Sequence, residues 1–284
     1  MAKLAFIGTG VMGAPIAGHL ATAGHSVTVY NRTRAKADAW AAKYGGSVAL
    51  TPADAAVGAD AVLTCVGNDD DLADVTLGAD GAFAAMREDA VFIDHTTVSA
   101  GIARRLAAER ALVVDAPVSG RQAGAESGKL SIMCGGSPEA LAKSGPLMAA
   151  YAARIVHVGA AGAGQTTKMV NQICIAGVLQ GLSEAVRFAQ ASALDLDKVF
   201  EAVSGGAAAS WQMQNRWATM AKDEFDFGFA VDWMRKDLGL ALDEAKVNGA
   251  TLPVAALIDQ FYAEVQKLGG ARQDTSALVR RLSK

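Results

Sequence analysis

Residues 4–13 read LAFIGTGVMG, a short apolar run that passes directly into a G-x-G-x-x-G motif. Each glycine has a steric role: Gly8 turns the chain out of a strand, Gly10 lets the backbone approach a pyrophosphate, and Gly13 lets a helix pack on the sheet. The helix start offers N–H groups and partial positive charge to phosphates. Here the motif follows the first strand, opens a helix and lies in a βαβ unit of about 30 residues, which is the context that such a site requires. We therefore predict a dinucleotide site rather than a turn used only for packing, with contacts from Gly8, Thr9, Gly10, Val11, Met12 and Gly13.

The first half of the chain alternates short apolar runs with longer amphipathic ones. Strands that are buried on both faces read as continuous apolar runs, and their alternation with helices predicts a parallel doubly wound sheet. The predicted helices are 11–23 and 34–44, and the predicted strands are 4–7, 26–30, 61–65, 91–94, 112–115, 131–134 and 154–157.

The strand pattern stops after about residue 163. Residues 164–192 carry apolar side chains at helical spacing over a stretch longer than an ordinary globular helix. This pattern predicts one long helix that joins two domains. The remainder reads as helical, with glycine breaks at 204–206, 248–249 and 269–270. We predict an α/β domain over 1–163, an interdomain helix over 164–192 and an all-α domain over 193–284.

Composition excludes several classes of protein. The chain has 284 residues, is 51% hydrophobic and carries a formal net charge of −3. It is too apolar for a disordered chain, and it offers no basic surface for nucleic acid. The absence of an 18-residue uncharged apolar run argues against a membrane span. The three cysteines form no C-x-x-C pair, which favours reduced thiols in a cytoplasmic protein and gives no reason to expect a metal.

The residues after the second predicted strand bear on the choice of cofactor. An acidic residue there would bind the adenosine ribose 2′-hydroxyl and repel a 2′-phosphate. This chain has Asn31, Arg32 and Thr33 instead, and a guanidinium can pair with a phosphate. We predict a preference for NADP(H), with NAD(H) as the second cofactor; the alternative is that Arg32 is an ordinary solvated side chain.

Four stretches together resemble the β-hydroxyacid dehydrogenases, a family that includes 3-hydroxyisobutyrate dehydrogenases, tartronate semialdehyde reductases and glyoxylate/succinic semialdehyde reductases. They span nearly the whole chain, so the resemblance is much more specific than the glycine motif alone. They are FIGTGVMGAP at 6–15, DAPVSG at 115–120, GAG at 162–164 with KMVNQ at 168–172, and KDL at 236–238.

The resemblance implies a Rossmann-type domain, a long interdomain helix and a helical domain that supports homodimers or homotetramers, with the active site between the domains. It also implies a small carboxylate-bearing substrate. Its motifs give Lys168 as the catalytic residue, Ser119 and Gly120 at the substrate carboxylate, Asn171 at the substrate, Lys236 at the cofactor, and Cys65, Val66 and Thr97 along the ribose and nicotinamide.

The chemistry around Lys168 agrees with this independently. Lys168, Asn171 and Gln172 are spaced i, i+3 and i+4, so they share one face of the predicted helix. Reduction of a carbonyl by hydride needs a proton donor, and an ammonium group serves if burial brings its pKa toward the working pH. The alternative for Lys168 taken alone is a solvated helix lysine. We include Gln172 with Asn171 as a substrate-binding candidate.

The turn at Ser119 and Gly120 suits an anion-binding nest, although a plain structural turn has the same residues. Asp115, at the end of the preceding strand, reads as an anchor or a helix cap and not as a catalytic residue. Two positions depart from the family. Arg121 stands where many members have a second glycine, and it either binds a second carboxylate or points to solvent. His95 stands where serine is common, and we favour a packing role for it over acid–base chemistry.

Aromatic residues gather in the predicted helical domain at 210–213 and 225–232. Most belong to its core, but family members use a few such side chains to close the substrate pocket. The candidates for that role are Trp211, Phe229 and Asp232.

The leading function is an NADP-preferring oxidoreductase that transfers hydride between nicotinamide and a small β-hydroxy acid or its semialdehyde or 2-oxo acid. An imine reductase or reductive aminase on the same fold is the first alternative, but those relatives typically replace the helix lysine, often with Asp or Tyr. The second alternative is a non-catalytic NADP-binding scaffold, against which the intact lysine motif argues.

Overall fold

The computed structural model describes residues 1–282, which form two compact units. The first unit covers Met1–Lys168 and the second begins at Met169. The long helix α9 (Ala163–Ala191) contains the boundary, so its first turns belong to one unit and the remainder to the other. The predicted fold class, a doubly wound α/β domain followed by a long helix and a helical domain, is confirmed.

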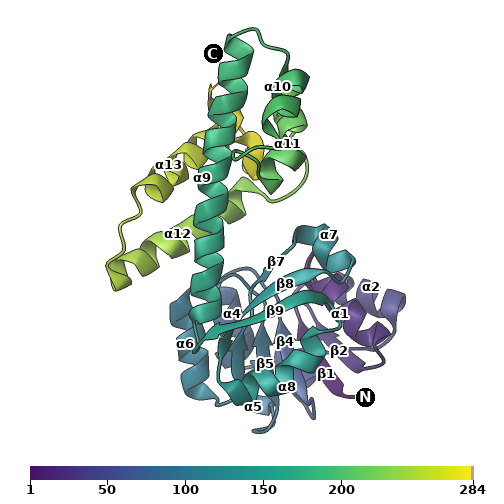
Figure 1. The fold of residues 1–284 in the computed structure, drawn as a ribbon. Helices are drawn as coiled ribbons and strands as arrows, with labels where there is room; N and C mark the ends of the chain where they lie inside the picture. Colours follow the sequence, from purple (N-terminus) through teal and green to yellow (C-terminus); the bar gives the residue numbers. More distant parts are fainter. Residues whose placement is uncertain (283–284) are drawn as a thin grey trace. The chain divides into compact units, whose positions relative to one another are not determined.

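The first unit is built on one sheet (Figure 1). Strands β1 to β6 run parallel in the order β3-β2-β1-β4-β5-β6, and β8 then pairs antiparallel with both β6 and β7. The strands are β1 (Lys3–Ile7), β2 (Ser26–Tyr30), β3 (Ser47–Val48), β4 (Ala61–Thr64), β5 (Val91–Asp94), β6 (Val113–Asp115), β7 (Val118–Ser119), β8 (Leu130–Gly136) and β9 (Ala152–Gly159).

The sheet is therefore mixed, whereas the sequence pattern predicted parallel strands throughout. Residues 120–129, which join β7 to β8, are fewer than the dozen or more that a parallel crossover needs. The chain consequently returns antiparallel at this point. Strand β9 lies parallel to β8, after the helix α8 (Pro138–Met148) has carried the chain back, so β8 and β9 both run opposite to β1–β6.

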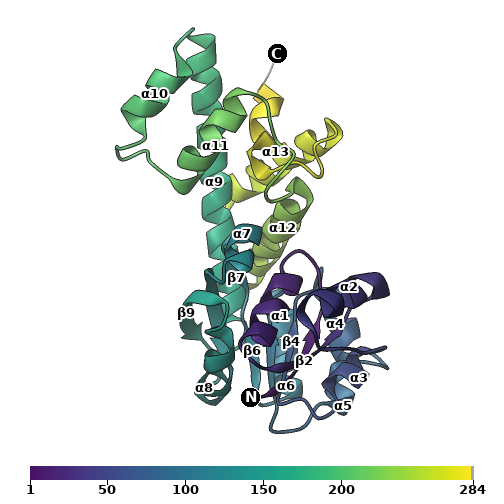
Figure 2. The same ribbon diagram turned by 90° about the vertical axis from the view of Figure 1, so that its right-hand side faces the viewer.

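Helices cover both faces of the sheet, as Figures 1 and 2 show. Alternate residues of β1 enter opposite cores, because Phe6 packs with α1 and α2 while Ile7 packs with the layer that contains α6. This double coverage makes the strands apolar on both faces, as the sequence pattern predicted. The remaining helices of this unit are α1 (Gly13–Thr22), α2 (Arg34–Tyr44), α3 (Pro52–Ala56), α4 (Asp69–Leu77), α5 (Ala82–Ala85), α6 (Ala100–Glu109) and α7 (Arg121–Glu126).

The second unit is helical and has its own core. Leu179 and Val186 of α9 are buried with Trp217 and Tyr262 from later helices. Two of the predicted glycine breaks, 204–206 and 269–270, fall between helices, and the third, 248–249, covers the last residue of α12 and its C-cap. The elements after α9 are α10 (Leu196–Val203), α11 (Trp211–Ala221), α12 (Val231–Asn248), α13 (Pro253–Lys267) and the 3₁₀ segment η1 (Thr275–Leu282).

Among the described residues, α9 is the one helix long and apolar enough to cross a membrane by length and composition. Part of its apolar surface packs within the protein, because Ala176, Leu179 and Leu182 are buried in the helical core.

Candidate active site

The glycine motif forms the turn between β1 and α1. Gly8 has a φ of +100°, and a Cβ there would overlap the carbonyl oxygen of Cys65. A Cβ on Gly13 would likewise overlap the Gly8 carbonyl. By contrast, a Cβ on Gly10 would meet nothing within 4 Å, so nothing within the protein requires glycine there. An open approach at the middle glycine is what a bound pyrophosphate needs, and the loop therefore fits the cofactor.

The end of β2 lies beside this loop. The Thr9 N–H donates to Asn31 Oδ1 at 3.0 Å, and Asn31 Nδ2 donates to the Thr33 carbonyl at 3.0 Å. The structure thus brings two predicted cofactor segments, 8–13 and 31–33, into contact. The Arg32 side chain is 82% exposed, and its Nη1 lies 2.7 Å from Oδ1 of Asp71.

Buried Asp94 organises the carboxyl ends of β4 and β5. Its Oδ1 accepts from the Thr64 hydroxyl at 2.7 Å and from the Thr96 N–H at 3.0 Å. The Thr96 hydroxyl in turn accepts from the Val66 N–H at 3.0 Å. Burial raises the pKa of Asp94 to about 7, against the opposing effect of these hydrogen bonds. The network holds two loops that carry the predicted cofactor residues Cys65, Val66 and Thr97.

His95 is buried and makes two hydrogen bonds. Its Nδ1 lies 2.7 Å from the Ala116 carbonyl and its Nε2 lies 2.9 Å from the Tyr151 hydroxyl. A carbonyl only accepts, so we assign the proton to Nδ1, and Nε2 accepts from Tyr151. Burial lowers the pKa of His95 to about 4, which keeps the ring neutral at pH 7. These contacts agree with the packing role favoured from the sequence.

The start of α9 is anchored by Asp115 at the end of β6. Its carboxylate accepts from the Gly162 N–H at 2.8 Å and from the Gln165 N–H at 2.9 Å, so Asp115 caps the helix from a neighbouring strand. Burial raises the pKa of Asp115, and the hydrogen bonds from Gly162 and Gln165 oppose that shift. A Cβ on Gly164 would come within 2.5 Å of the Asp115 and Met133 carbonyl oxygens, so only glycine fits this close approach.

Gln165 provides a second anchor that sequence reasoning missed. It is fully buried, its Nε2 donates to the Thr96 carbonyl at 2.7 Å, and its Oε1 accepts from the Val98 N–H at 3.1 Å. A polar residue one helical turn before Lys168 was the available signal. The sequence could not show which loop it would meet.

Lys168 is 8% exposed, and its Nζ donates to the Val118 carbonyl at 2.9 Å. This places the ammonium group beside the Ser119–Gly120 turn, so two sequence motifs fifty residues apart meet here. Gly120 has a φ of +138°, and Arg121, at the start of α7, has a φ of +60°. A non-glycine residue in the left-handed region is uncommon, and it lies here next to the predicted carboxylate site.

In the helical unit, Asn171 and Gln172 join a chain of polar contacts. Asn171 Nδ2 donates to Gln172 Oε1 at 2.7 Å, and Gln172 Nε2 donates to Asp237 Oδ2 at 2.7 Å. Lys236 Nζ lies 3.5 Å from Oδ1 of Asp237. The structure thus brings the motif on α9 together with the KDL motif on α12. Asp237, only 2% exposed, links Gln172 to Lys236. It belongs to the KDL motif, but nothing in the sequence assigned it a role.

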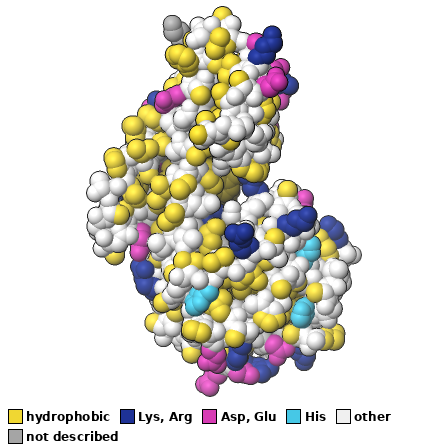
Figure 3. Space-filling model, viewed as in Figure 1, with side chains coloured by type: hydrophobic (Ala, Val, Ile, Leu, Met, Phe, Trp, Pro, Cys, Tyr) yellow, Lys and Arg dark blue, Asp and Glu magenta, His cyan; other side chains and the backbone are white. Residues whose placement is uncertain are grey.

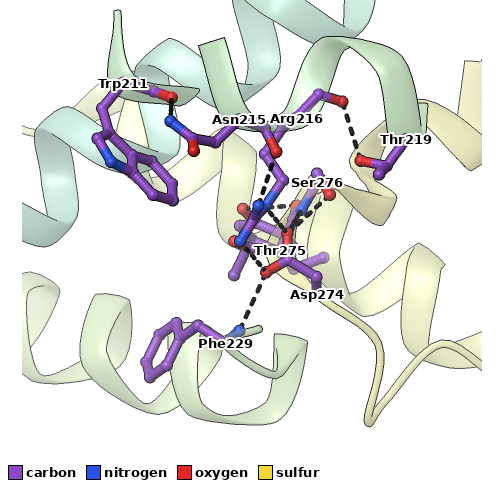
Figure 4. A network of polar contacts seen from close by, with 9 residues as sticks. Trp211, Asn215, Arg216, Thr219, Phe229, Asp274, Thr275 and Ser276 are labelled. Carbon is purple, nitrogen blue, oxygen red and sulfur yellow. Dashed lines mark hydrogen bonds and ion pairs between the residues drawn. The ribbon is translucent and has the colours of Figure 1, made fainter. Parts of the chain in front are cut away.

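The aromatic candidates lie around an ion pair in the helical unit (Figure 4). Arg216 Nε donates to Asp274 Oδ1 at 3.0 Å, and the Phe229 N–H donates to Asp274 Oδ2 at 3.0 Å. The Arg216 guanidinium lies 5.2 Å from the centre of the Trp211 ring. Asp232 stands apart from this group, since its Oδ1 accepts from Gln266 Nε2 at 2.6 Å. Pocket closure by Trp211, Phe229 and Asp232 stays a prediction.

Within the described part of the chain, no three His, Cys, Asp or Glu side chains lie close enough together to hold a metal ion.

Comparisons with known proteins identify the family. Residues 3–159 match the NAD binding domain of 6-phosphogluconate dehydrogenase, and residues 162–282 match the family model described as NAD-binding of NADP-dependent 3-hydroxyisobutyrate dehydrogenase. An uncharacterized oxidoreductase of Shewanella frigidimarina is 58% identical, covering 100% of this chain and 99% of the relative. The NAD-dependent L-serine dehydrogenase of Pseudomonas aeruginosa is 33% identical, covering 98% and 97%.

A solved structure is similar over its full length. It is the 3-hydroxyisobutyrate dehydrogenase of Mycobacterium tuberculosis with L-serine, which has a TM-score of 0.91 and 32% identity and covers 100% of both chains. With both family models, these matches show that the chain belongs to the 3-hydroxyisobutyrate dehydrogenase family, the nicotinamide-dependent hydroxyacid dehydrogenases that act on CH–OH groups.

Proposed function

We propose that this protein is an NADP-preferring dehydrogenase or reductase that interconverts a small β-hydroxy acid with its semialdehyde or 2-oxo acid. The observation that carries the proposal is the position of Lys168, whose ammonium group is buried and hydrogen-bonded to the Val118 carbonyl beside the Ser119–Gly120 turn. A proton donor next to an anion-binding turn is what reduction of a carboxylate-bearing carbonyl compound requires.

The proton chemistry belongs to Lys168. A nicotinamide held by the glycine loop would supply hydride chemistry at the substrate carbonyl. Lys168 donates a proton to the carbonyl oxygen as negative charge develops there, which leaves a neutral amine and a hydroxyl group. In oxidation the neutral amine takes the hydroxyl proton. Asp115 and Gln165 serve as positioning residues, because both fix the helical turn from which Lys168 extends.

Substrate recognition is assigned to the turn and to the polar face of α9. Ser119 and Gly120 hold the carboxylate through a hydroxyl and backbone N–H groups, and Asn171 and Gln172 contact the remainder of the substrate. Arg121 either binds a second carboxylate or points to solvent. Loss of activity in Arg121→Ala on a substrate that carries two carboxylates but not on one that carries a single carboxylate would assign it to recognition, and equal losses on both would remove it from that role.

Cofactor recognition is assigned to the loop at Gly8, Thr9, Gly10, Val11, Met12 and Gly13 for the pyrophosphate. Asn31, Arg32 and Thr33 bind the adenosine ribose, where the Arg32 guanidinium favours a 2′-phosphate. Cys65, Val66 and Thr97 line the ribose and nicotinamide, and Lys236 reaches the cofactor from the helical unit. Trp211, Phe229 and Asp232 close the substrate pocket.

A substrate panel tests the function. Glyoxylate, succinic semialdehyde, tartronate semialdehyde, 3-hydroxyisobutyrate, L-serine, L-threonate and a cyclic imine are each assayed with NADP(H) and NAD(H). We expect turnover of at least one hydroxy acid or semialdehyde, with the higher kcat/KM for NADP(H). Cyclic-imine reduction without any hydroxy-acid or semialdehyde turnover would overturn the assignment, and a higher kcat/KM with NAD(H) would overturn the cofactor preference.

We also propose a cytoplasmic homodimer or homotetramer that assembles through the helical unit. Hydrophobic side chains gather over α12 and α13 in Figure 3, and Val247, Val254 and Leu257 are more than half exposed. Exposed apolar patches commonly mark protein interfaces. A monomer mass in multi-angle light scattering would contradict the assembly.

A further inference from the structure

Asp71 faces Arg32 at the proposed nucleotide site. Arg32 follows β2, and its Nη1 lies 2.7 Å from Oδ1 of Asp71, at the first turn of α4. The two residues are 39 positions apart and reach each other only because β2 and β4 flank β1 in the sheet. The Arg32 side chain is 82% exposed, whereas that of Asp71 is 25% exposed.

Asp71 is held in place by the loop after β4. Its backbone N–H donates to the Asn68 side chain at 2.8 Å, which caps α4. Its carboxylate lies so close over Gly67 that a Cβ at that glycine would overlap Oδ2. Arg32 can therefore swing on a long solvated stem, but the negative charge of Asp71 stays near the end of β2.

This position matters because the doubly wound fold receives the adenosine ribose at the end of its second strand. An acidic residue there favours a ribose 2′-hydroxyl, and a guanidinium favours a 2′-phosphate. This chain supplies both charges at one place, with the cation from β2 and the anion from α4. A 2′-phosphate that pairs with Arg32 must share it with Asp71 and must also approach a fixed like charge.

We propose that Asp71 is a specificity determinant that opposes Arg32, weakens binding of the 2′-phosphate and so keeps NAD(H) usable alongside NADP(H). The inference rests on the proposed dinucleotide site. Removal of the charge in Asp71→Asn should strengthen binding of a 2′-phosphorylated nucleotide by about tenfold relative to its unphosphorylated counterpart, the effect of an exposed charge at short range. The shift should shrink in 0.5 M salt because the pair is exposed.

Calorimetric titration with two fragments tests this without turnover. The probes are 2′,5′-ADP and 5′-AMP, which differ only in the 2′-phosphate. In Asp71→Asn we expect the affinity ratio to move toward 2′,5′-ADP by about tenfold, with 5′-AMP binding unchanged as the check on folding. The matched control is Asp38→Asn, which removes the carboxylate of the neighbouring exposed pair Arg34–Asp38 (2.8 Å) and should leave the ratio unchanged.

The outcomes separate the two proposals. If the ratio in Asp71→Asn is unchanged, or moves toward 5′-AMP, the role of Asp71 is wrong while the nucleotide site stands. If Arg32→Gln leaves the binding of 2′,5′-ADP unchanged, the NADP preference in the proposed function is wrong. If the wild-type protein binds neither fragment, the nucleotide site and the role of Asp71 fall together. An equal shift in Asp38→Asn would overturn the specific role of Asp71.

Discussion

Single buried side chains tie the carboxyl ends of the central strands together. His95 joins β5 to the Ala116 carbonyl and to Tyr151, and Asp94 joins β4 to β5 through Thr64 and Thr96. Both groups are removed from water, so both have shifted pKa values, in opposite directions. Burial favours the neutral form in each case.

The shift at His95 predicts a dependence of stability on pH. Its pKa is lowered from 6.5 to about 4, so the unfolded state binds more protons than the folded state between those values. The stability contributed by neutral His95 is therefore present above pH 6.5 and is lost as the pH falls toward 4. Because the pKa of Asp94 is raised, its contribution to folding stability decreases as the pH rises from about 4 to about 7, opposite to that of His95.

A difference measurement isolates His95, because the contribution of Asp94 is common to both proteins. At pH 7 we expect His95→Gln to be less stable than the wild type in urea unfolding, since a Gln amide reproduces the two hydrogen bonds poorly. At pH 5 the difference in unfolding free energy between the wild type and His95→Gln should be smaller by about 2 kcal/mol. A gap of equal size at both pH values would contradict a neutral buried His95.

For individual side chains, the sequence predicted which residues the site contains better than it predicted the groups to which they hydrogen-bond. The glycine motif was predicted from its spacing and context and Lys168 from the family resemblance, and the catalytic role of Lys168 stays a prediction. Gln165 and Asp237 were not assigned roles, because their partners, the Thr96 carbonyl and Gln172, come from distant segments. A local pattern carries no information about which distant group a buried amide or carboxylate will meet.

The position of the start of α9 depends on the close approach of Gly164 to the sheet. A Cβ on Gly164 would lie 2.5 Å from two carbonyl oxygens of the sheet, so Gly164→Ala must push the helix start away from β6 and β8. We expect a loss of about 1–3 kcal/mol in unfolding free energy. Activity should fall as well, because the same turn carries Lys168.

Gly181 in the same helix is the matched control. A Cβ there meets nothing within 4 Å, so Gly181→Ala should stabilise α9 by about 0.5–1 kcal/mol through helix propensity. Urea unfolding followed by circular dichroism compares the two variants. Equal effects of both substitutions would show that the close approach at Gly164 does not limit the position of the helix.

Some elements were predicted to the residue, whereas the helices α4, α6, α7 and α8 were given no predicted range. The predicted ranges 26–30, 34–44 and 91–94 match β2, α2 and β5 residue for residue, and the long helix is displaced by one residue. The two-residue strands β3 and β7 and the short helices α3 and α5 were missed, because so few residues show no period. The strand at 131–134 was predicted and lies within β8, but its antiparallel direction was not, because direction depends on connection length and not on hydrophobic pattern.

For the whole molecule, separate cores predict separate responses to mutation. Asp274 is fully buried and accepts from Arg216, Phe229 and Ser276, all within the helical unit (Figure 4). Asp274→Ala leaves the Arg216 charge without its buried partner, which should cost the helical unit about 3–5 kcal/mol.

Tryptophan fluorescence reports this loss, since Trp211, Trp217 and Trp233 lie in the helical unit and Trp40 alone lies in the first. Asp243→Ala is the control, because the Lys246–Asp243 pair is about three-quarters exposed and should contribute at most about 1 kcal/mol. Similar losses in both variants would contradict the structural role of the Arg216–Asp274 pair.

The fold class and the family of the whole chain followed from the sequence, because the glycine motif, the strand–helix alternation and the four family motifs all agree. The identity of the substrate could not be predicted from the sequence. Its identity depends on side chains such as Arg121, Trp211 and Phe229, whose roles no local pattern defines.

The most direct test of the central claim is the rate of hydride transfer in Lys168→Ala, followed by nicotinamide absorbance in a single turnover. With Lys168 as the proton donor, the rate should fall by about 10²–10⁴-fold while nucleotide binding is retained. Lys168→Arg should fail similarly, because arginine keeps the charge but does not release a proton. Hydride transfer at the wild-type rate in Lys168→Ala would contradict the account.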